Sequence, residues 1–205
     1  MAFSTNVFIN CPFDNEFRVI LRPLLFSIIY FGLEPKISKT ESSGNVRVNQ
    51  IKKHIRESKF SIHDLSRSRP MQINDLPRFN MPYELGLDVG CAEFGGKKYQ
   101  GKRILILETE PYHYQKVLSD IAGQDIESHA NNPETMIRKV RNWFSTADPS
   151  NAYPSANRVW IVYNQFYADM TKNLVSKDFT LAEVEDMPTS DFIKFSKEWV
   201  RDFTA

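Results

Sequence analysis

The segment FSIHDLS, residues 60–66, precedes LPRFNMPYELGLDVG, residues 76–90. The first segment predicts a buried strand ending in Asp64 and Ser66, and the second predicts a helix with Asn80 as its N-cap. A strand followed by a helix is the repeating unit of α/β proteins. Because ligands bind at the carboxyl ends of strands in an open α/β sheet, both polar residues are candidate ligand contacts.

Glu84 lies in the first turn or two of this predicted helix. Pro82 suits an early helical position. Gly86 and Gly90 weaken the helix, which predicts that its backbone lies close against a sheet or a ligand. The glutamate therefore has two readings: it acts on a ligand, or it favours the positive end of the helix with Asp88 as a solvated neighbour.

The same alternation runs through the first 148 residues. Apolar patterns predict a weak, peripheral strand as well as buried ones, and helices between them. Residues 110–125 have no regular period and are interpreted as a loop with a short helix. Strands are expected at 7–9, 34–40, 60–66 and 103–107, and helices at 17–31, 48–55, 80–94 and 132–144. This order is typical of an α/β protein with a parallel sheet.

The C-terminal fifty residues carry no strand signal. Residues 148–155, DPSNAYPS, predict a linker. Helical spacing follows it, and Thr180 with Glu183 has the spacing of a capping box. We therefore divide the chain into an α/β domain, residues 1–148, and a small helical extension, residues 155–205, which packs on the α/β body or on a neighbouring chain.

Composition restricts the function classes. A formal net charge of +1 gives no global field for nucleic acid or an acidic membrane surface. Cys11 and Cys91 predict reduced, buried thiols, and His113 and His129 have no partner at metal-ligand spacing. No basic leader or membrane-length apolar run is visible, so we expect a cytoplasmic protein without membrane, metal or direct nucleic-acid binding.

Three motifs then suggest a family. VFINCPFD at residues 7–14, Asp64, and MPYELG at residues 81–86 resemble the superfamily that unites nucleoside 2-deoxyribosyltransferases with TIR (Toll/interleukin-1 receptor) domains. The resemblance covers roughly residues 5–145 and implies a flavodoxin-like sheet. It also implies that Glu84 attacks or stabilises an anomeric carbon. The sequence is further similar to bacterial TIR-like proteins of antiphage defence, which implies NAD as substrate.

The chemistry is consistent with this resemblance. Cleavage of a ribosyl–nitrogen bond creates positive charge at the anomeric carbon, which a carboxylate can stabilise or trap. Nicotinamide, already cationic, leaves without a general acid. The nucleotide is then a substrate, and no permanently bound cofactor is expected. Candidate substrate contacts, for the ring, the ribose hydroxyls and the pyrophosphate, are Asn10, Pro12, Phe13, Asp14, Ser43, Arg47, Asp64, Ser66, Arg78, Asn80 and Tyr83.

Three functions remain open. The first is an enzyme that cleaves the N-glycosidic bond of NAD or a related nucleotide, as a glycohydrolase or a cyclase. The second is a nucleotide sensor without chemistry, favoured by the unusual approach RFNMP, residues 78–82. The third is a TIR-like assembly module, a homo-oligomer built through the aromatic stripe of the tail: Phe192, Phe195, Trp199 and Phe203. For some of these residues a role without function is also open: Arg47 and Arg78 are then solvated, and His63 is a packed core histidine.

Overall fold

A five-stranded parallel sheet forms the centre of the residues that the computed structural model describes: 3–38, 47–68, 76–116, 118–121, 123–124 and 126–204. The strands are β1 (Asn6–Asn10), β2 (Glu34–Lys36), β3 (Phe60–Asp64), β4 (Arg103–Glu108) and β5 (Ile126–Ser128). They lie in the order β2-β1-β3-β4-β5, and each neighbouring pair is parallel. This is the flavodoxin-like strand order, so the predicted fold class is confirmed.

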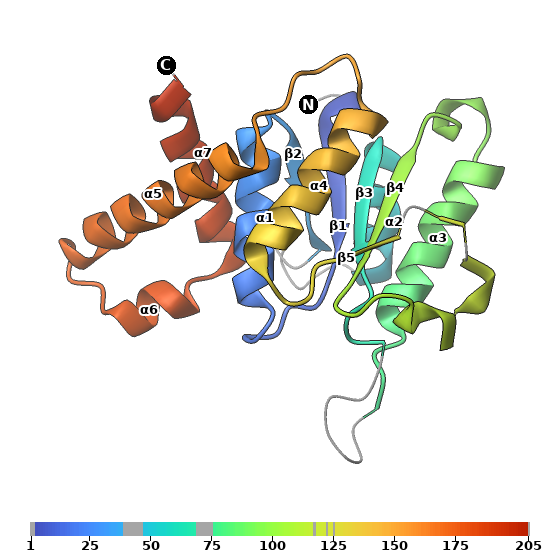
Figure 1. Ribbon diagram of the computed structural model, residues 1–205, viewed down its shortest axis with the longest axis horizontal. Helices are drawn as coiled ribbons and strands as arrows, with labels where there is room; N and C mark the ends of the chain where they lie inside the picture. The colour runs from blue at the N-terminus through green and yellow to red at the C-terminus, as the bar shows by residue number, and fades with distance from the viewer. Residues whose placement is uncertain are drawn as a thin grey trace.

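Helices cover both faces of the sheet, as Figure 1 shows. They are α1 (Arg18–Tyr30) and α4 (Pro133–Ala147) on one face, and α2 (Arg47–Glu57) and α3 (Asn80–Phe94) on the other. Side chains alternate between faces along a strand, so Val7 and Ile9 join the core beneath α1 and α4. Phe8, between them, packs on Ile51 and Ile55 of α2.

The edge strands are the least predictable part of the sheet. β1 and β3 are buried along their whole length, which agrees with the apolar run Val7-Phe8-Ile9 of β1, whereas β3 alternates Phe60 and Ile62 with polar residues. β2 occupies one edge, as its weak pattern predicts. β5 occupies the other and was not predicted, because its three residues, Ile126–Ser128, include a single apolar side chain. Short 3-10 helices lie at Phe3–Thr5, Lys97–Tyr99, His113–Lys116 and Ser119–Ile121.

The predicted N-cap residue precedes the helix in α4 but lies inside the helix in α3. Asn132 accepts a hydrogen bond from the backbone N–H of Thr135 at 2.8 Å, and Pro133 is the first helical residue, as predicted. Asn80, in contrast, is the first residue of α3, and Phe79 occupies the cap position without a side-chain hydrogen bond. The prediction that Asn80 is the N-cap is therefore wrong.

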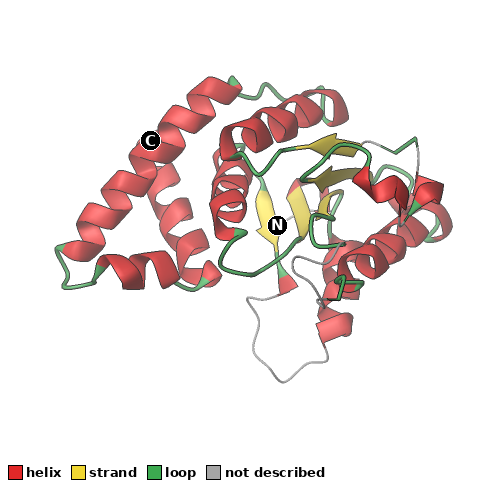
Figure 2. Ribbon diagram, turned by 60° about the horizontal axis from the view of Figure 1, so that its bottom comes forward, coloured by secondary structure: helices red, strands yellow, loops and turns green. Residues whose placement is uncertain are grey.

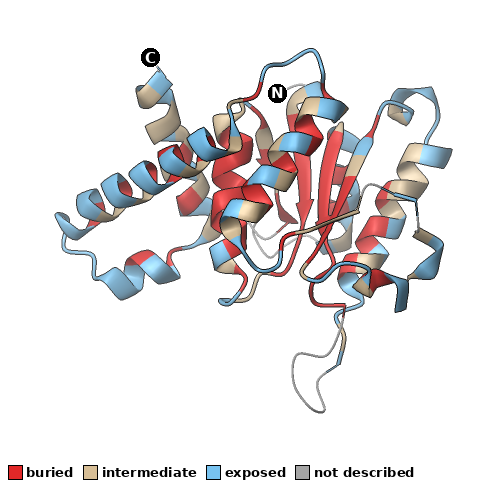
Figure 3. Cartoon of the chain, viewed as in Figure 1, coloured by how far each residue is buried: buried red, intermediate tan, exposed pale blue. Residues whose placement is uncertain are grey.

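The C-terminal helices share the core of the α/β body. They are α5 (Ala156–Val175), α6 (Leu181–Asp186) and α7 (Thr189–Thr204), and Thr180 with Glu183 forms the predicted capping box. In Figures 1 and 2 they lie together beside α1, on the side of the molecule away from α3. The ring of Phe26 in α1 stacks 4.8 Å from Phe166, and Trp199 lies 6.1 Å away. Figure 3 shows the buried strands and the exposed outer sides of these helices.

Candidate functional site

Two of the four side chains that α3 buries over its described length are acidic. Over its fully described length, α3 buries Met81, Glu84, Leu85 and Asp88, which follow one another at helical spacing. Asp88 has no exposed surface, so the prediction of a solvated neighbour is wrong. Gly86 is exposed, and within the described residues a Cβ on Gly86 or Gly90 would meet no atom within 4 Å. The expected close approach of the helix backbone to the sheet at these glycines is therefore wrong, and an approach to a ligand stays a prediction.

A continuous polar network lies beneath α3. The Asn10 side chain, at the end of β1, donates one amide hydrogen to the carbonyl oxygen of Met81 and the other to His63 Nδ1, both over 3.0 Å. Since His63 Nδ1 accepts, the ring carries its hydrogen on Nε2 and donates it to Asp88 Oδ2 at 3.0 Å. Lys102 Nζ lies 3.0 Å from Asp88 Oδ1, as an ion pair without hydrogen-bond angles.

Asp88 is held in its charged form by these neighbours. Burial would raise the pKa of its carboxyl, but the hydrogen bond from His63 and the charge of Lys102 outweigh burial and lower that pKa. Lys102 itself donates to the carbonyl oxygens of Ile55 and Ser58, at 2.9 and 2.6 Å. The network therefore joins α2, α3, β1 and β3.

Glu84 has a different environment from Asp88, one turn away. Its side chain is 5% exposed, and its Oε1 lies 3.6 Å from Nη2 of Arg47, whose side chain is 55% exposed. Burial raises the pKa of Glu84, and the charge of Arg47 offsets this only in part. Among the residues that the structure describes, no hydrogen bond to the Glu84 carboxylate is present.

The other buried carboxylates of the described chain all accept hydrogen bonds. Asp64 accepts from the Ser66 N–H and Glu108 from the Tyr114 N–H. Asp88 accepts from His63, and Asp148 from Tyr153. Burying a carboxylate without such donors is costly, so natural folds usually supply them. Within the described residues Glu84 is the exception, which makes it the strongest candidate for chemistry on a ligand.

Asp64 and Ser66 do not join Glu84. Asp64 has the same parity on β3 as Ile62, which belongs to the core under α1 and α4, whereas His63 faces α3. His129, after β5, places its Nε2 3.0 Å from Asp64 Oδ2 and 3.2 Å from Ser66 Oγ. Among the described residues, Asp64 and Ser66 therefore contact His129 on the face of the sheet opposite α3, and not Glu84.

Serine, histidine and aspartate in contact suggest a hydrolytic triad, but the hydrogen bonds exclude it. His129 Nδ1 accepts from the Asn131 N–H at 3.1 Å, so Nε2 carries the hydrogen and donates to Asp64. Both Ser66 and Asp64 contact this one nitrogen, whereas a triad needs the serine and the carboxylate on different ring nitrogens. The cluster ties β5 to β3 as a buried structural group.

Asp14 is the centre of an arginine cluster at the end of β1. Arg67 binds it through two hydrogen bonds, of 3.1 and 3.0 Å, and Arg78 Nη1 lies 3.3 Å away. Burial would raise the pKa of Asp14, but the hydrogen bond and charge of Arg67 outweigh it and lower that pKa. Asp14 and Arg78, both predicted substrate contacts, therefore lie side by side. The Asp14 carboxylate offsets the positive charge of Arg78.

The remaining predicted contacts are scattered. Pro12 is buried, and Phe13 is half-buried against the main core. Asn80 and Tyr83 are exposed on α3. Asn10 is 2% exposed, and both of its amide hydrogens are used within the protein. Ser43 lies outside the described residues.

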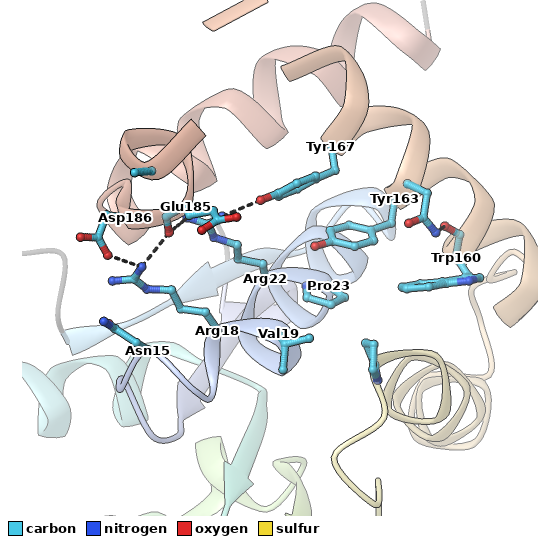
Figure 4. A pocket seen from close by; sticks show the side chains of 13 residues that line it. Asn15, Arg18, Val19, Arg22, Pro23, Trp160, Tyr163, Tyr167, Glu185 and Asp186 are labelled. Atoms are coloured by element: carbon cyan, nitrogen blue, oxygen red, sulfur yellow. Dashed lines mark hydrogen bonds and ion pairs between the residues drawn. The ribbon is translucent and has the colours of Figure 1, made fainter. Parts of the chain in front are cut away.

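Two cavities formed by described residues do not include Glu84 in their lining. One of about 680 Å³, between α1, α5 and α6, is lined by Arg18, Arg22, Trp160, Tyr163 and Tyr167 among others (Figure 4). Both arginines there donate to backbone carbonyls at the end of α6. Another of about 410 Å³, between α2 and α3, includes Cys91 and Phe94.

Sequence reasoning missed His63, Asp88, Lys102, Arg67 and His129 as partners of the candidate residues. One signal was present: Glu84 and Asp88 are four residues apart and share a face with the apolar Met81 and Leu85. The other partners come from distant parts of the chain, which no local pattern reveals.

Three further observations concern metal binding, membrane helices and similarity to known proteins. Within the described residues, no group of three or more His, Cys, Asp or Glu side chains is arranged to hold a metal ion. No helix there combines the length and the apolar character that crossing a membrane requires. In comparisons with known proteins, the chain matches no family model, no curated protein and no solved structure.

Proposed function

We propose that the chain cleaves the N-glycosidic bond of NAD or a related nucleotide, with Glu84 as the catalytic carboxylate. The observation that carries the proposal is the state of this side chain: it is 5% exposed, and no donor among the described residues hydrogen-bonds it. A carboxylate kept in this state is available to a developing positive charge. Its position in α3, the helix after β3, also agrees with the motif resemblance that suggested the reaction.

The reaction needs little from the protein beyond this carboxylate. As the ribosyl–nitrogen bond breaks, positive charge develops at the anomeric carbon and nicotinamide leaves as a neutral base. The Glu84 carboxylate stabilises that charge or forms a covalent ester with the carbon, and water or an internal nucleophile then completes hydrolysis or cyclisation. The low polarity that raises the pKa of Glu84 also strengthens its attraction for the cationic centre.

Arg47 supplies the second charged group of the site. Its guanidinium lies 3.6 Å from Glu84 on a side chain that is 55% exposed. An exposed arginine can turn toward an anionic group at little cost and bind a pyrophosphate in bidentate fashion. We therefore assign Arg47 to substrate binding. When Arg47 binds the pyrophosphate, its ion pair with Glu84 opens and the Glu84 carboxylate is free to contact the sugar.

The test is nicotinamide release from NAD by the purified chain, compared with Glu84→Gln and Glu84→Ala. We expect release by the unchanged chain and a loss of at least about 100-fold in both variants, since the carboxylate contacts the reacting carbon. Glu108→Gln is the matched control, because Glu108 is also buried but accepts from the Tyr114 N–H. Release that is equal in the Glu84 variants and the unchanged chain would remove Glu84 from the mechanism.

A nucleotide sensor without chemistry is the second candidate, favoured by the ion pair itself. A carboxylate paired with a guanidinium is a weaker nucleophile than an unpaired one, and the pair could open only to admit a ligand. Calorimetry with NAD, NADP, nucleoside diphosphates and deoxynucleosides separates the two functions. Saturable binding without nicotinamide release by the unchanged chain would favour the sensor.

A further inference from the structure

We infer that Asn10, His63 and Asp88 are positioning residues that fix α3 on the sheet and thereby place the Glu84 carboxylate. This inference rests on the proposed function of Glu84. None of the three side chains is assigned to substrate: Asn10 is 2% exposed and the other two have no exposed surface. Their effect on a reaction would pass through the helix that carries Glu84.

The geometry brackets Glu84 between two attachment points. Asn10 Nδ2 donates to the Met81 carbonyl oxygen, three residues before Glu84, and His63 Nε2 donates to Asp88, four residues after it. Both contacts measure 3.0 Å and lie on the same face of α3 as Glu84 itself. Because His63 Nδ1 accepts from Asn10, one strand-end amide orients the ring that holds the second point.

Lys102 closes the network at its far end. The residue is 7% exposed and lies just before β4; its ammonium binds the carbonyl oxygens of Ile55 and Ser58 and lies 3.0 Å from Asp88 Oδ1. The chain of contacts therefore runs from the end of α2 through α3 to two neighbouring strands. Rotation or sliding of α3 would break at least one buried polar contact, which is expensive in a low dielectric.

Position matters here because Glu84 has no hydrogen bond of its own among the described residues. Its carboxylate is placed by the helix backbone, by packing and by a single ion pair with Arg47 at 3.6 Å. A shift of about 1 Å at a reacting group can cost roughly 100-fold in rate. Buried ionic groups contribute little net stability compared with apolar packing, so a network of this kind is better suited to fixing geometry.

Matched variants test the inference through kinetics. His63→Phe keeps a ring but removes both hydrogen bonds, whereas His63→Gln retains an amide that can replace one of them. We expect His63→Phe to lower kcat for NAD cleavage by about 10–100-fold with KM within about twofold, and His63→Gln to recover part of the loss. Asp88→Asn should resemble His63→Gln. Glu108→Gln, buried but not bonded to α3, should leave kcat unchanged, because the Gln carbonyl oxygen can still accept from the Tyr114 N–H.

A second readout does not depend on the reaction. Cys91 lies on α3 three residues after Asp88 and is half-buried, whereas Cys11 is 1% exposed. Loosening of α3 should raise the rate of thiol labelling at Cys91 in folded His63→Phe by about tenfold over Glu108→Gln. If the unchanged chain releases no nicotinamide, the proposed reaction fails while this labelling still tests the network. Equal labelling in both variants, or a fall in kcat that merely follows Tm in both, would overturn the inference.

Discussion

Tyr153 donates its hydroxyl hydrogen to Asp148 Oδ2 over 2.7 Å, across the connection between α4 and α5. Asp148 also accepts from the side chains of Ser150 and Asn151, at 3.2 and 2.6 Å. The ring of Tyr153 lies 5.0 Å from Phe31. The segment with a linker's composition is thus a packed turn, and these contacts direct the chain from the α/β body into the C-terminal helices.

Removing the hydroxyl in Tyr153→Phe should lower the free energy of unfolding by about 1–3 kcal/mol at neutral pH, because the buried Asp148 loses a donor. Burial would raise the pKa of Asp148, but its hydrogen bonds and Lys59 outweigh burial and lower that pKa. A lowered pKa means that this stabilisation is present above the unfolded pKa and is lost as pH falls through the folded one. Urea unfolding at neutral and acid pH measures both effects.

Tyr112→Phe is the control for this prediction, because Tyr112 is 70% exposed. It should leave unfolding unchanged at either pH. A Tyr153→Phe variant as stable as the unchanged chain would mean that the turn is held by ring packing alone.

Arg22 ties α6 to α1, as Figure 4 shows with Arg18 beside it. Its Nη2 donates to the carbonyl oxygens of Val184 and Glu185, and its Nη1 to the Tyr167 hydroxyl. Arg22→Met keeps the aliphatic stem and removes these bonds, so we expect a loss of about 2–3 kcal/mol. Amide hydrogen exchange should speed up in residues 176–190 before the sheet is affected.

Arg18→Met provides the comparison. Arg18 pairs with Asp186, but the two side chains are 29% and 71% exposed, so this pair should contribute less than about 1 kcal/mol. Similar exchange rates in the two variants would show that burial of Arg22 gives it no special role.

The sequence predicted the elements whose patterns are local. β4 contains an apolar run long enough to recognise, β3 alternates Phe60 and Ile62 with polar residues, and α4 has its cap residue and its first-turn proline in order. β5 was missed because a three-residue edge strand has too few residues to show a period. Its place in the sheet depends on pairing with β4, which is 18 or more residues earlier in sequence.

The candidate site divides in the same way. Glu84 could be selected from its place in the strand–helix order. The burial of Asp88 could not be assigned, since its partner His63 lies 25 residues away. Likewise, no residue near His129 in sequence indicates that it contacts a carboxylate, because its partner Asp64 lies 65 residues away. Long-range pairing decides which carboxylates are neutralised, and only three-dimensional structure gives that pairing.

Ser66→Ala tests the exclusion of a serine nucleophile. The His129 ring donates from Nε2 toward Asp64 and cannot take a proton from Ser66 at that same nitrogen. We therefore expect nicotinamide release within about twofold of the unchanged chain, because no bond to a reacting atom is lost. The unchanged chain, treated with a serine-directed phosphonylating reagent, should remain unlabelled at Ser66. Labelling there would show that the hydroxyl is activated and would require a different tautomer of His129.

Glu84 should destabilise the fold that holds it, since an active carboxylate is kept at a cost. Burial raises its pKa and Arg47 offsets this only in part, so the folded chain binds this proton more tightly than the unfolded chain does. Stability is then lost as pH rises from the unfolded pKa through the raised folded one. Glu84→Gln avoids this loss, and we expect its Tm to exceed that of the unchanged chain by about 2–4 °C at neutral pH.

Asp88→Asn, one turn along the same helix, should show the opposite sign. His63 and Lys102 outweigh the effect of burial and lower the pKa of Asp88, so its charged form stabilises the fold at neutral pH. Thermal unfolding of the two variants from acid to neutral pH would give curves that diverge from that of the unchanged chain in opposite directions. A Glu84→Gln variant less stable than the unchanged chain at neutral pH would mean that Glu84, like Asp88, serves the fold.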